Sequence, residues 1–371
     1  MPIHVPMVDV RTVGAGGGSI ARVNAAGLLE VGPESAGADP GPICYGRGGN
    51  EPTISDANLL LGRLDPSRLN VAGGVNLEAV RSVFAEKIAA PLGLSIEDAA
   101  LAVIRVANLK MAGAIRMVSV SLGADPRDFS LFAFGGAGPL HASAMARELG
   151  IPSVLIPARP GITNAIGCVS ADLRHDFVQT INRPLGGVTT EELTEVFAAQ
   201  SDHGRALIEA DAVELVGTEY HHSLDMQFLG QTHILRVELS GRDVSIDDIR
   251  SAFEKVYFNR FRVELENIEA NIVNVNTSVI GRRTPSDLSR LIAPADRRST
   301  TEDAQTGRRT LVTEHSTHHA PVIWRDHLPL TASIEGPAII EQMDTTILLE
   351  PGDTARGDEN GNILIEVGHG D

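Results

Sequence analysis

The spacing of apolar residues predicts a strand, a helix and a second strand near the middle of the chain. Leu131 to Phe134 is an apolar run that predicts a short buried strand, and residues 152–157 predict the next one. Between the two strands, apolar residues keep helical spacing as far as Leu149. Pro139 is tolerated in a first helical turn because its missing N–H has no partner there, and Gly150 is typical of a helix end.

The turn between this strand and this helix is rich in glycine. Gly135, Gly136 and Gly138 flank Ala137 and lead directly into the predicted helix. Bare backbone N–H groups at the start of a helix can bind an anion or a nucleotide, so the pattern predicts such a site. The alternative is a glycine turn that only packs the helix against the strand.

A second glycine-rich segment, Gly14 to Ser19, follows a predicted strand at Val8 to Val13. Ile20 to Val23 and Leu28 to Val31 then predict a hairpin and not a helix. A dinucleotide-binding loop of the Rossmann type must lead directly into a helix, so a Rossmann-type site at Gly14 to Ser19 is disfavoured. Because the chain reaches this segment so early, little sequence is left for a surrounding sheet, and we expect a longer protein.

The loop after this hairpin carries the first candidate carboxylates. Gly32 to Pro42 is rich in turn-forming residues and contains Asp39, and constrained loops of this kind are often functional, although a solvated turn is the alternative. Further on, Ser55 or Asp56 can cap the helix that follows. As a lone carboxylate, Asp56 fits a helix cap better than a metal ligand.

The second half of the chain has a different composition. The change falls at Arg183 to Gly187, where we place a domain boundary. Pro285 to Arg309 is polar and weakly patterned and predicts a mobile loop, and Gly336 to Val367 predicts three short strands. The remaining predicted elements are helices at about residues 77–89, 95–118, 189–210 and 245–261, and strands within residues 170–182, 214–239 and 268–280.

Composition and charge exclude some classes of function. The 371 residues are 43% hydrophobic and 21% charged, which suffices for two or three globular domains. The net charge of -17 argues against a surface for nucleic acid or for an anionic membrane, although backbone amides could still build a phosphate site. Cys44 and Cys168 are too few for a disulfide framework. With no apolar run of membrane-spanning length and no signal peptide, a cytoplasmic protein is expected.

Two pairs of adjacent histidines invite a metal-site interpretation. They are His221-His222 and His318-His319. Adjacent side chains on a strand point to opposite faces, so neither pair can chelate one ion by itself. We expect ordinary strand or loop histidines at these positions. His141, in the first turn of the predicted helix, is expected to pack or to form a hydrogen bond.

Several motifs in order along the chain point to one family. They are residues 12–20, 31–42, 44–49, 55–59 and 134–141, with the tail motifs at residues 336–341 and 344–346. Together they resemble the hydantoinase A/5-oxoprolinase family, which also includes subunits of ATP-dependent ketone carboxylases. The resemblance covers nearly the whole chain. Asn271 and Asn276 depart from it, because the family pattern leads us to expect Glu and Arg there, and an ion pair at these positions is therefore not expected.

The resemblance implies an α/β fold in two parts. Residues 1–183 would form part of an actin/Hsp70-like (ribonuclease H-like) ATPase core, and residues 188–371 an α+β C-terminal domain rich in strands. In such a core, two phosphate loops and an adenosine loop surround the nucleotide. The turn from Gly135 to Gly138 resembles the adenosine loop. The two Asp-Gly-Gly-Thr type phosphate loops would lie upstream of this sequence, so the chain resembles the C-terminal half of such a subunit.

The same resemblance implies part of an ATP-dependent hydrolase of cyclic amides, acting on a hydantoin or 5-oxoproline type substrate and inactive without the N-terminal half. ATP would phosphorylate the amide oxygen and make the carbon open to attack by water. The expected partners are the N-terminal half with the phosphate loops, a hydantoinase B-type subunit and the cyclic amide. The alternatives are a ketone carboxylase subunit, which would activate an enolate or bicarbonate, and a non-catalytic assembly subunit.

The same resemblance also implies which residues form the site. Asp39 and Asp56 would hold Mg²⁺ or Mn²⁺ through water. The residues expected to pass the nucleotide closely are Gly135, Gly136 and Gly138. The residues expected to offer amides to phosphate or substrate are Gly16, Gly17, Gly18 and Ser19.

Overall fold

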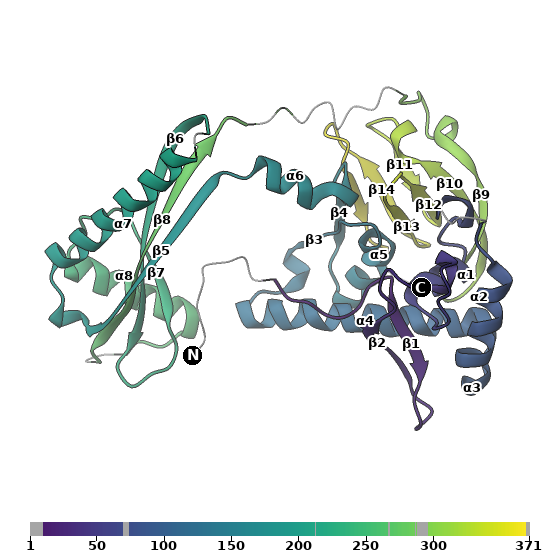
Figure 1. The fold of residues 1–371 in the computed structure, drawn as a ribbon, viewed down its shortest axis with the longest axis horizontal. Helices are drawn as coiled ribbons and strands as arrows, with labels where there is room; N and C mark the ends of the chain where they lie inside the picture. The colour runs from purple at the N-terminus through teal and green to yellow at the C-terminus, as the bar shows by residue number, and fades with distance from the viewer. Residues whose placement is uncertain are drawn as a thin grey trace. The chain divides into compact units, whose positions relative to one another are not determined.

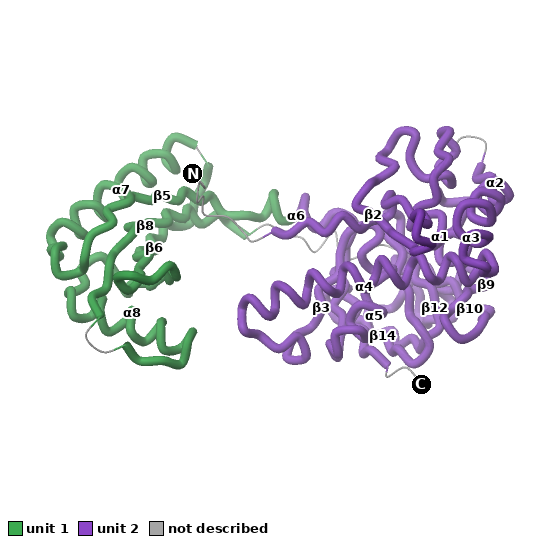
Figure 2. The backbone as a smooth tube through the Cα atoms, turned by 90° about the horizontal axis from the view of Figure 1, so that it is seen from below, with its two compact units in different colours: residues 1–8, 167–286 green, residues 9–166, 287–371 purple. Residues whose placement is uncertain are grey.

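The chain divides into two compact units. The computed structural model describes residues 10–69, 74–211, 213–265, 268–285, 287 and 296–368. Unit 1 comprises residues 1–8 and 167–286, and unit 2 comprises residues 9–166 and 287–371, as Figure 2 shows by colour. The predicted division at residues 183–188 is a division along the sequence and stays a prediction. Within the described residues, no helix combines the length and apolarity needed to cross a membrane.

The N-terminal part of unit 2 is a hairpin beside a group of helices (Figure 1). The hairpin pairs β1 (Ser19–Val23) with β2 (Leu29–Ser35) in the antiparallel sense, as predicted. Aliphatic side chains from the hairpin and the helices share one core. The helices are α1 (Ile54–Leu60), α2 (Leu77–Phe84), α3 (Ala90–Leu92), which a π-helical turn at Ala85–Ala89 joins to α2, and α4 (Ile96–Leu122).

A five-stranded sheet follows, and it contains the predicted strand–helix–strand unit. Its strand order is β11-β14-β15-β4-β3, with β3 parallel to β4 and the other pairs antiparallel. The helix α5 (Gly138–Leu149) connects β3 to β4 and packs on the sheet, and Gly150 ends it in the left-handed conformation. The strands are β3 (Ser130–Phe132), β4 (Ser153–Ile156), β11 (Ser333–Glu335), β14 (Thr354–Gly357) and β15 (Ile363–Glu366).

A four-stranded sheet completes unit 2. Its order is β13-β12-β10-β9, with only β10 and β12 parallel. Leu140 of α5 packs against this sheet, so one helix contributes to the cores beside both sheets. The strands are β9 (Gln305–Val312), β10 (Thr317–Trp324), β12 (Ala338–Glu341) and β13 (Thr346–Leu349).

Unit 1 is an antiparallel sheet of order β5-β8-β6-β7 with two long helices packed on one face. The helices begin where they were predicted, and their N-caps are Thr189 and Ser245. His222 is buried and faces Thr277, whereas His221 is exposed, so the pair points to opposite faces as predicted. The elements are α6 (Thr163–Ser170), which leads into the unit, β5 (Leu173–Pro184), α7 (Thr190–Ala210), β6 (Leu215–Phe228), β7 (Leu235–Leu239), α8 (Ile246–Phe261) and β8 (Ala270–Arg283).

The two asparagines of β8 occupy the positions at which the family pattern leads us to expect Glu and Arg. Both are buried. Asn271 donates a hydrogen bond from Nδ2 to Asn182 Oδ1 at 2.7 Å. The amide of Asn276 has no hydrogen-bond partner among the described residues. The charge pair is therefore replaced by neutral amides, which cost less to bury than unpaired charges.

Three local predictions were wrong. Val10 to Val13 forms no strand, and residues 8 and 9 lie outside the described part. The strand β3 is not buried, because it is the edge strand of its sheet and the side chain of Phe132 is 47% exposed. The tail from Gly336 to Val367 contains four strands, β12 to β15, and not three.

The predicted mobile loop at Pro285 to Arg309 was wrong in its described C-terminal part. A 3-10 turn at Glu302–Ala304 leads into β9, which starts at Gln305. The sequence concealed this strand because its first residues are polar and exposed on both faces, so they show no apolar alternation. Residues 286 and 288–295 lie outside the described part.

Candidate functional site

The glycine turn before α5 leaves the helix N-terminus without a side-chain cap. Gly135 has φ +84°, a left-handed conformation that favours glycine, and its N–H donates to the carbonyl of Pro160 at 2.8 Å. The N-cap residue is Ala137, which has no side-chain acceptor for the first-turn N–H groups. Such N–H groups, together with the helix dipole, favour a negatively charged ligand.

Two residues of the C-terminal tail hold this turn from behind. The hydroxyl of Thr345 lies 3.0 Å from the carbonyl oxygen of Gly135 and 3.2 Å from that of Gly136. A Cβ atom on Gly136 would lie 3.3 Å from the backbone oxygen of Asp344. The carboxylate of Asp344 in turn lies so close to Gly161 that a Cβ atom there would clash with it. The tail therefore holds the turn in place and leaves little room for a side chain at Gly136, whereas a Cβ atom on Gly135 or Gly138 would meet no atom within 4 Å.

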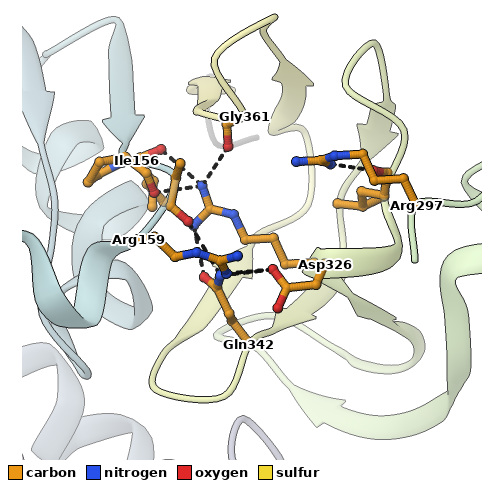
Figure 3. A network of polar contacts seen from close by, with 10 residues as sticks. Ile156, Arg159, Arg297, Asp326, Gln342 and Gly361 are labelled. Atoms are coloured by element: carbon orange, nitrogen blue, oxygen red, sulfur yellow. Dashed lines mark hydrogen bonds and ion pairs between the residues drawn. The ribbon is translucent and has the colours of Figure 1, made fainter. Parts of the chain in front are cut away.

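A buried arginine, Arg325, links the end of β4 to the C-terminal tail. Arg325 is 4% exposed, and its Nη2 lies within 3.3 Å of the carbonyl oxygens of Ile156, Pro157 and Gly361 (Figure 3). Its Nη1 donates to Gln342 Oε1 at 3.4 Å. Burial, with a smaller contribution from the neighbouring Arg159, lowers the pKa of Arg325 to about 10, so the group is still charged at neutral pH.

Gln342 extends this network toward the glycine turn. Its Nε2 donates to the carbonyl of Ala158 at 3.3 Å and to Asp326 Oδ1 at 3.1 Å. Asp326 also pairs with Arg159 at 2.7 Å (Figure 3). Residues 158 and 159 precede Pro160, whose carbonyl accepts from Gly135. The network therefore positions the segment against which the glycine turn rests.

The other predicted amide site, Gly16 to Ser19, is a tight turn at the start of β1. Gly16 donates from N–H to Ser19 Oγ at 3.0 Å, and the N–H of Ser19 returns to the carbonyl of Gly16 at 2.8 Å. The carbonyl of Gly17 accepts from Ser55 N–H, in the first turn of α1. The N–H groups of Gly17 and Gly18 have no hydrogen-bond partner among the described residues, so these two amides are the ones that a ligand could use.

The two predicted amide sites lie on the same unit. A cavity of about 720 Å³ has both Val13 and Gly138 in its wall. The segment that leads into the first turn and the start of α5 therefore face one cavity. No hydrogen bond joins the two turns to each other in the described part of the chain.

The carboxylate of Asp56 is fully occupied by hydrogen bonds of the protein. Its Oδ1 accepts from Cys44 N–H at 2.8 Å. Its Oδ2 accepts from the N–H groups of Ile43 at 3.3 Å and Thr53 at 3.0 Å, and from the Thr53 hydroxyl at 2.7 Å. Asp56 is completely buried and completes a capping box at the start of α1. These hydrogen bonds give the carboxylate of Asp56 a structural role at the start of α1.

Asp39 lies apart from these contacts, on the exposed part of the loop before Asp56. The described residues contain no group of three or more His, Cys, Asp or Glu side chains that could hold a metal ion. The residues present thus do not fit a Mg²⁺ or Mn²⁺ site made by Asp39 and Asp56, and that assignment stays a prediction without support from the geometry.

Sequence reasoning left Asp344 and Thr345 without a role in the site. Both belong to a tail motif that was noted only as part of the family resemblance. They reach the glycine turn because β12 and β13 pair as neighbours and the turn between them projects toward α5, which packs on β13. More than 200 residues separate them from Gly135, so no local pattern could have predicted the contact.

The comparison with known families agrees with this architecture. Residues 1–177 match the family described as hydantoinase/oxoprolinase, and residues 188–366 match the hydantoinase/oxoprolinase C-terminal domain. The chain belongs to the hydantoinase/oxoprolinase family. The crystal structure of ATP-dependent caprolactamase from Pseudomonas jessenii aligns with a TM-score of 0.83 at 36% identity, covering 99% of this chain and 54% of that one. The predicted fold class is thereby confirmed.

Three curated relatives illustrate the range of this family. Caprolactamase subunit alpha of Pseudomonas jessenii is 36% identical, covering 99% of this chain and 54% of the relative. Acetophenone carboxylase gamma subunit of Aromatoleum aromaticum is 30% identical, covering 98% and 52%. 5-Oxoprolinase 1 of Arabidopsis thaliana is 31% identical, covering 98% and 30%. The chain thus spans about half the length of the first two relatives and less of the third.

Proposed function

We propose that this chain is the C-terminal part of an ATP-dependent hydrolase of cyclic amides, and that the glycine turn before α5 binds the nucleotide. The observation that carries the proposal is the uncapped N-terminus of α5 behind Gly135 to Gly138, held in place by Thr345. It stands in a chain that is 36% identical to a caprolactamase subunit. Caprolactam and 5-oxoproline are both cyclic amides, which favours that substrate class.

The chemistry would proceed in three steps. The amide oxygen attacks the γ-phosphorus of ATP, the bond to ADP breaks, and a phosphorylated imidate forms. Water then adds to the imidate carbon, the C–N bond breaks as the ring nitrogen takes up a proton, and an acyl phosphate forms. A second water hydrolyses the acyl phosphate to the amino acid and inorganic phosphate. In this scheme the glycine turn binds and orients ATP, and positioning supplies most of the rate enhancement of phosphoryl transfer. The amides of Gly17 and Gly18 would contact phosphate or substrate.

An apolar face of unit 2 supports the proposal of a partner. The cavity of about 720 Å³ lies between the C-terminal half of α4 and the edge strand β3. Phe129 and Leu122 are 56% and 67% exposed beside it. Open sheet edges with apolar side chains are normally covered. We infer that the region of the relatives that this chain does not cover, here called the complementary region, packs on this face. A hydantoinase B-type subunit would be a further partner.

The ketone carboxylase function is the second candidate. It rests on the identity of 30% to acetophenone carboxylase gamma subunit, over 98% of this chain. The same nucleotide site would then activate an enolate or bicarbonate. A non-catalytic assembly subunit is the third reading, and it requires that the glycine turn bind no nucleotide.

ATP turnover distinguishes these functions. The chain should be co-expressed with the complementary region, and ATP hydrolysis should be measured with a lactam, with 5-oxoproline, and with a ketone plus bicarbonate. We expect at least a tenfold stimulation by one of the cyclic amides and no hydrolysis by the chain alone. Stimulation by the ketone mixture alone would contradict the hydrolase proposal.

The variant Phe132→Asp, which puts a charge on the open edge of β3, should lower co-purification of the chain with the complementary region.

A further inference from the structure

The guanidinium of Arg63 is buried in unit 2 and forms no ion pair with the described residues. Burial lowers the pKa of Arg63, and the charge of Glu350 acts in the opposite direction. Arg63 follows α1 in the sequence and is 4% exposed. Nη1 lies 3.5 Å from Asn58 Oδ1, at the limit of a hydrogen bond, and Nε has no partner among the described residues. No carboxylate of the described chain lies within ion-pair distance of it. Because buried charged groups are normally both paired and hydrogen-bonded, this group requires an explanation.

Arg63 lies in the wall of a cavity of about 450 Å³. The rest of the wall comes mainly from α4, through residues such as Asn108, and from α5, through residues such as Arg147. This cavity is distinct from the one beside the glycine turn, since the two share no lining residue. A ligand of a few heavy atoms fits such a volume.

Most other charged groups of this wall are held in ion pairs. The ion pairs are Arg105 with Glu314 at 2.9 Å, Arg147 with Glu350 and with Asp353 at 2.8 Å, and Glu148 with Arg116 at 3.8 Å. Asp98 has no ion pair among the described residues and accepts a hydrogen bond from the hydroxyl of Ser95 at 2.6 Å. Arg63 is therefore the one cation of the described wall residues that has no ion pair, and a cation selects an anion.

Asn108 provides a second donor in the same cavity wall as Arg63. Its Oδ1 lies 2.7 Å from Nδ1 of His141, which is 4% exposed. Burial and then the charge of Arg63 lower the pKa of His141 to about 3, so the imidazole is neutral and its Nδ1–H donates to Asn108. The Nδ2 amide of Asn108 is left as a donor in the cavity wall.

We propose that this cavity binds a small oxyanion, a phosphate or a carboxylate, through the guanidinium of Arg63 and the amide of Asn108. Guanidinium donors match the geometry of both anions. The competing explanation is a water molecule that bridges Arg63 to Glu350. The proposal does not depend on nucleotide binding at Gly135 to Gly138, because the site lies in another cavity.

The test uses the 371-residue chain with ¹⁵N-labelled arginine. Inorganic phosphate and acetate are titrated separately at constant ionic strength, and the Nε–H resonance of Arg63 is followed by NMR. We expect one of the two anions to shift this resonance in a saturable way. In calorimetry, Arg63→Met should lower the affinity for that anion at least tenfold. The matched control Arg105→Met, which removes an exposed arginine of the same wall, should leave the affinity within twofold.

The two anions distinguish the source of the ligand, since saturation by phosphate indicates a phosphate group and saturation by acetate a carboxylate. An Arg63 resonance that neither anion moves would overturn the proposal in favour of the bridging water. Equal loss of affinity in both arginine variants would also overturn it. The NMR readout uses the wild-type chain, so it decides the question even if Arg63→Met fails to fold.

Discussion

Replacing Gly136 by valine is expected to weaken ATP binding at least tenfold, equivalent to about 1.4 kcal/mol, in the complex of the chain with the complementary region. A Cβ atom on Gly136 already lies 3.3 Å from the backbone oxygen of Asp344, so the larger valine must push the turn away from the tail. That movement breaks the contacts of Thr345 with the two glycine carbonyls and misaligns the N–H groups at the start of α5. Calorimetric titration with ATP measures the effect.

The control for this variant is Gly113→Val in α4. A Cβ atom on Gly113 meets no atom within 4 Å, so valine there tests a glycine replacement without displacing the turn. Its ATP affinity should match that of the unmodified complex. Gly136→Val should also lose about 1 to 2 kcal/mol of unfolding free energy, the usual cost of a moderate steric clash. An unchanged ATP affinity in Gly136→Val would remove the turn from the nucleotide site.

Replacing Asp56 by alanine is expected to lower the unfolding free energy by about 4 kcal/mol. The carboxylate is fully buried and accepts four hydrogen bonds, three of them from backbone N–H groups. Its loss leaves those three donors unpartnered at about 1 to 3 kcal/mol each, partly relieved by water entering the site. Urea denaturation of the chain measures the change.

The exposed carboxylate of the same loop serves as the control, and Asp39→Ala should change stability by less than about 0.5 kcal/mol. Both measurements should be made with EDTA and with added Mg²⁺. If Asp56 acts as a helix cap, its replacement costs the same in both conditions. A loss of stability that appears only in the presence of Mg²⁺ would instead support the metal-ligand assignment.

The sequence predicted well those elements whose evidence is local. The turn, the helix and the second strand between Gly135 and Ile156 lie where the apolar spacing put them, and Gly150 ends the helix as expected. The helices that follow Thr189 and Ser245 also begin where they were predicted. In each case a few neighbouring residues determine the backbone conformation, through missing N–H groups, left-handed glycine or side-chain acceptors.

Pairing between distant segments could not be predicted. The strand β3 was expected to be buried because its residues are apolar. It is an edge strand instead, because β4 is its only neighbour in the described sheet and the tail strand β15 pairs with the other side of β4. The contact of Thr345 with Gly135 depends on the same long-range arrangement. The N-cap of α1 is Thr53, and not Ser55 or Asp56 as predicted, although Asp56 completes the capping box. The hydrogen bonds of Asp56 to Ile43 and Cys44 come from the folding of the preceding loop.

Photolabelling with 8-azido-ATP tests the central claim most directly, because it reports where the adenine lies. The complex of the chain with the complementary region should be irradiated, digested and analysed by mass spectrometry, with and without excess ATP. The account predicts ATP-protected labelling on the peptides that carry residues 134–141 or 344–346. Protected labelling confined to residues 167–286, or labelling that ATP does not suppress, would contradict it.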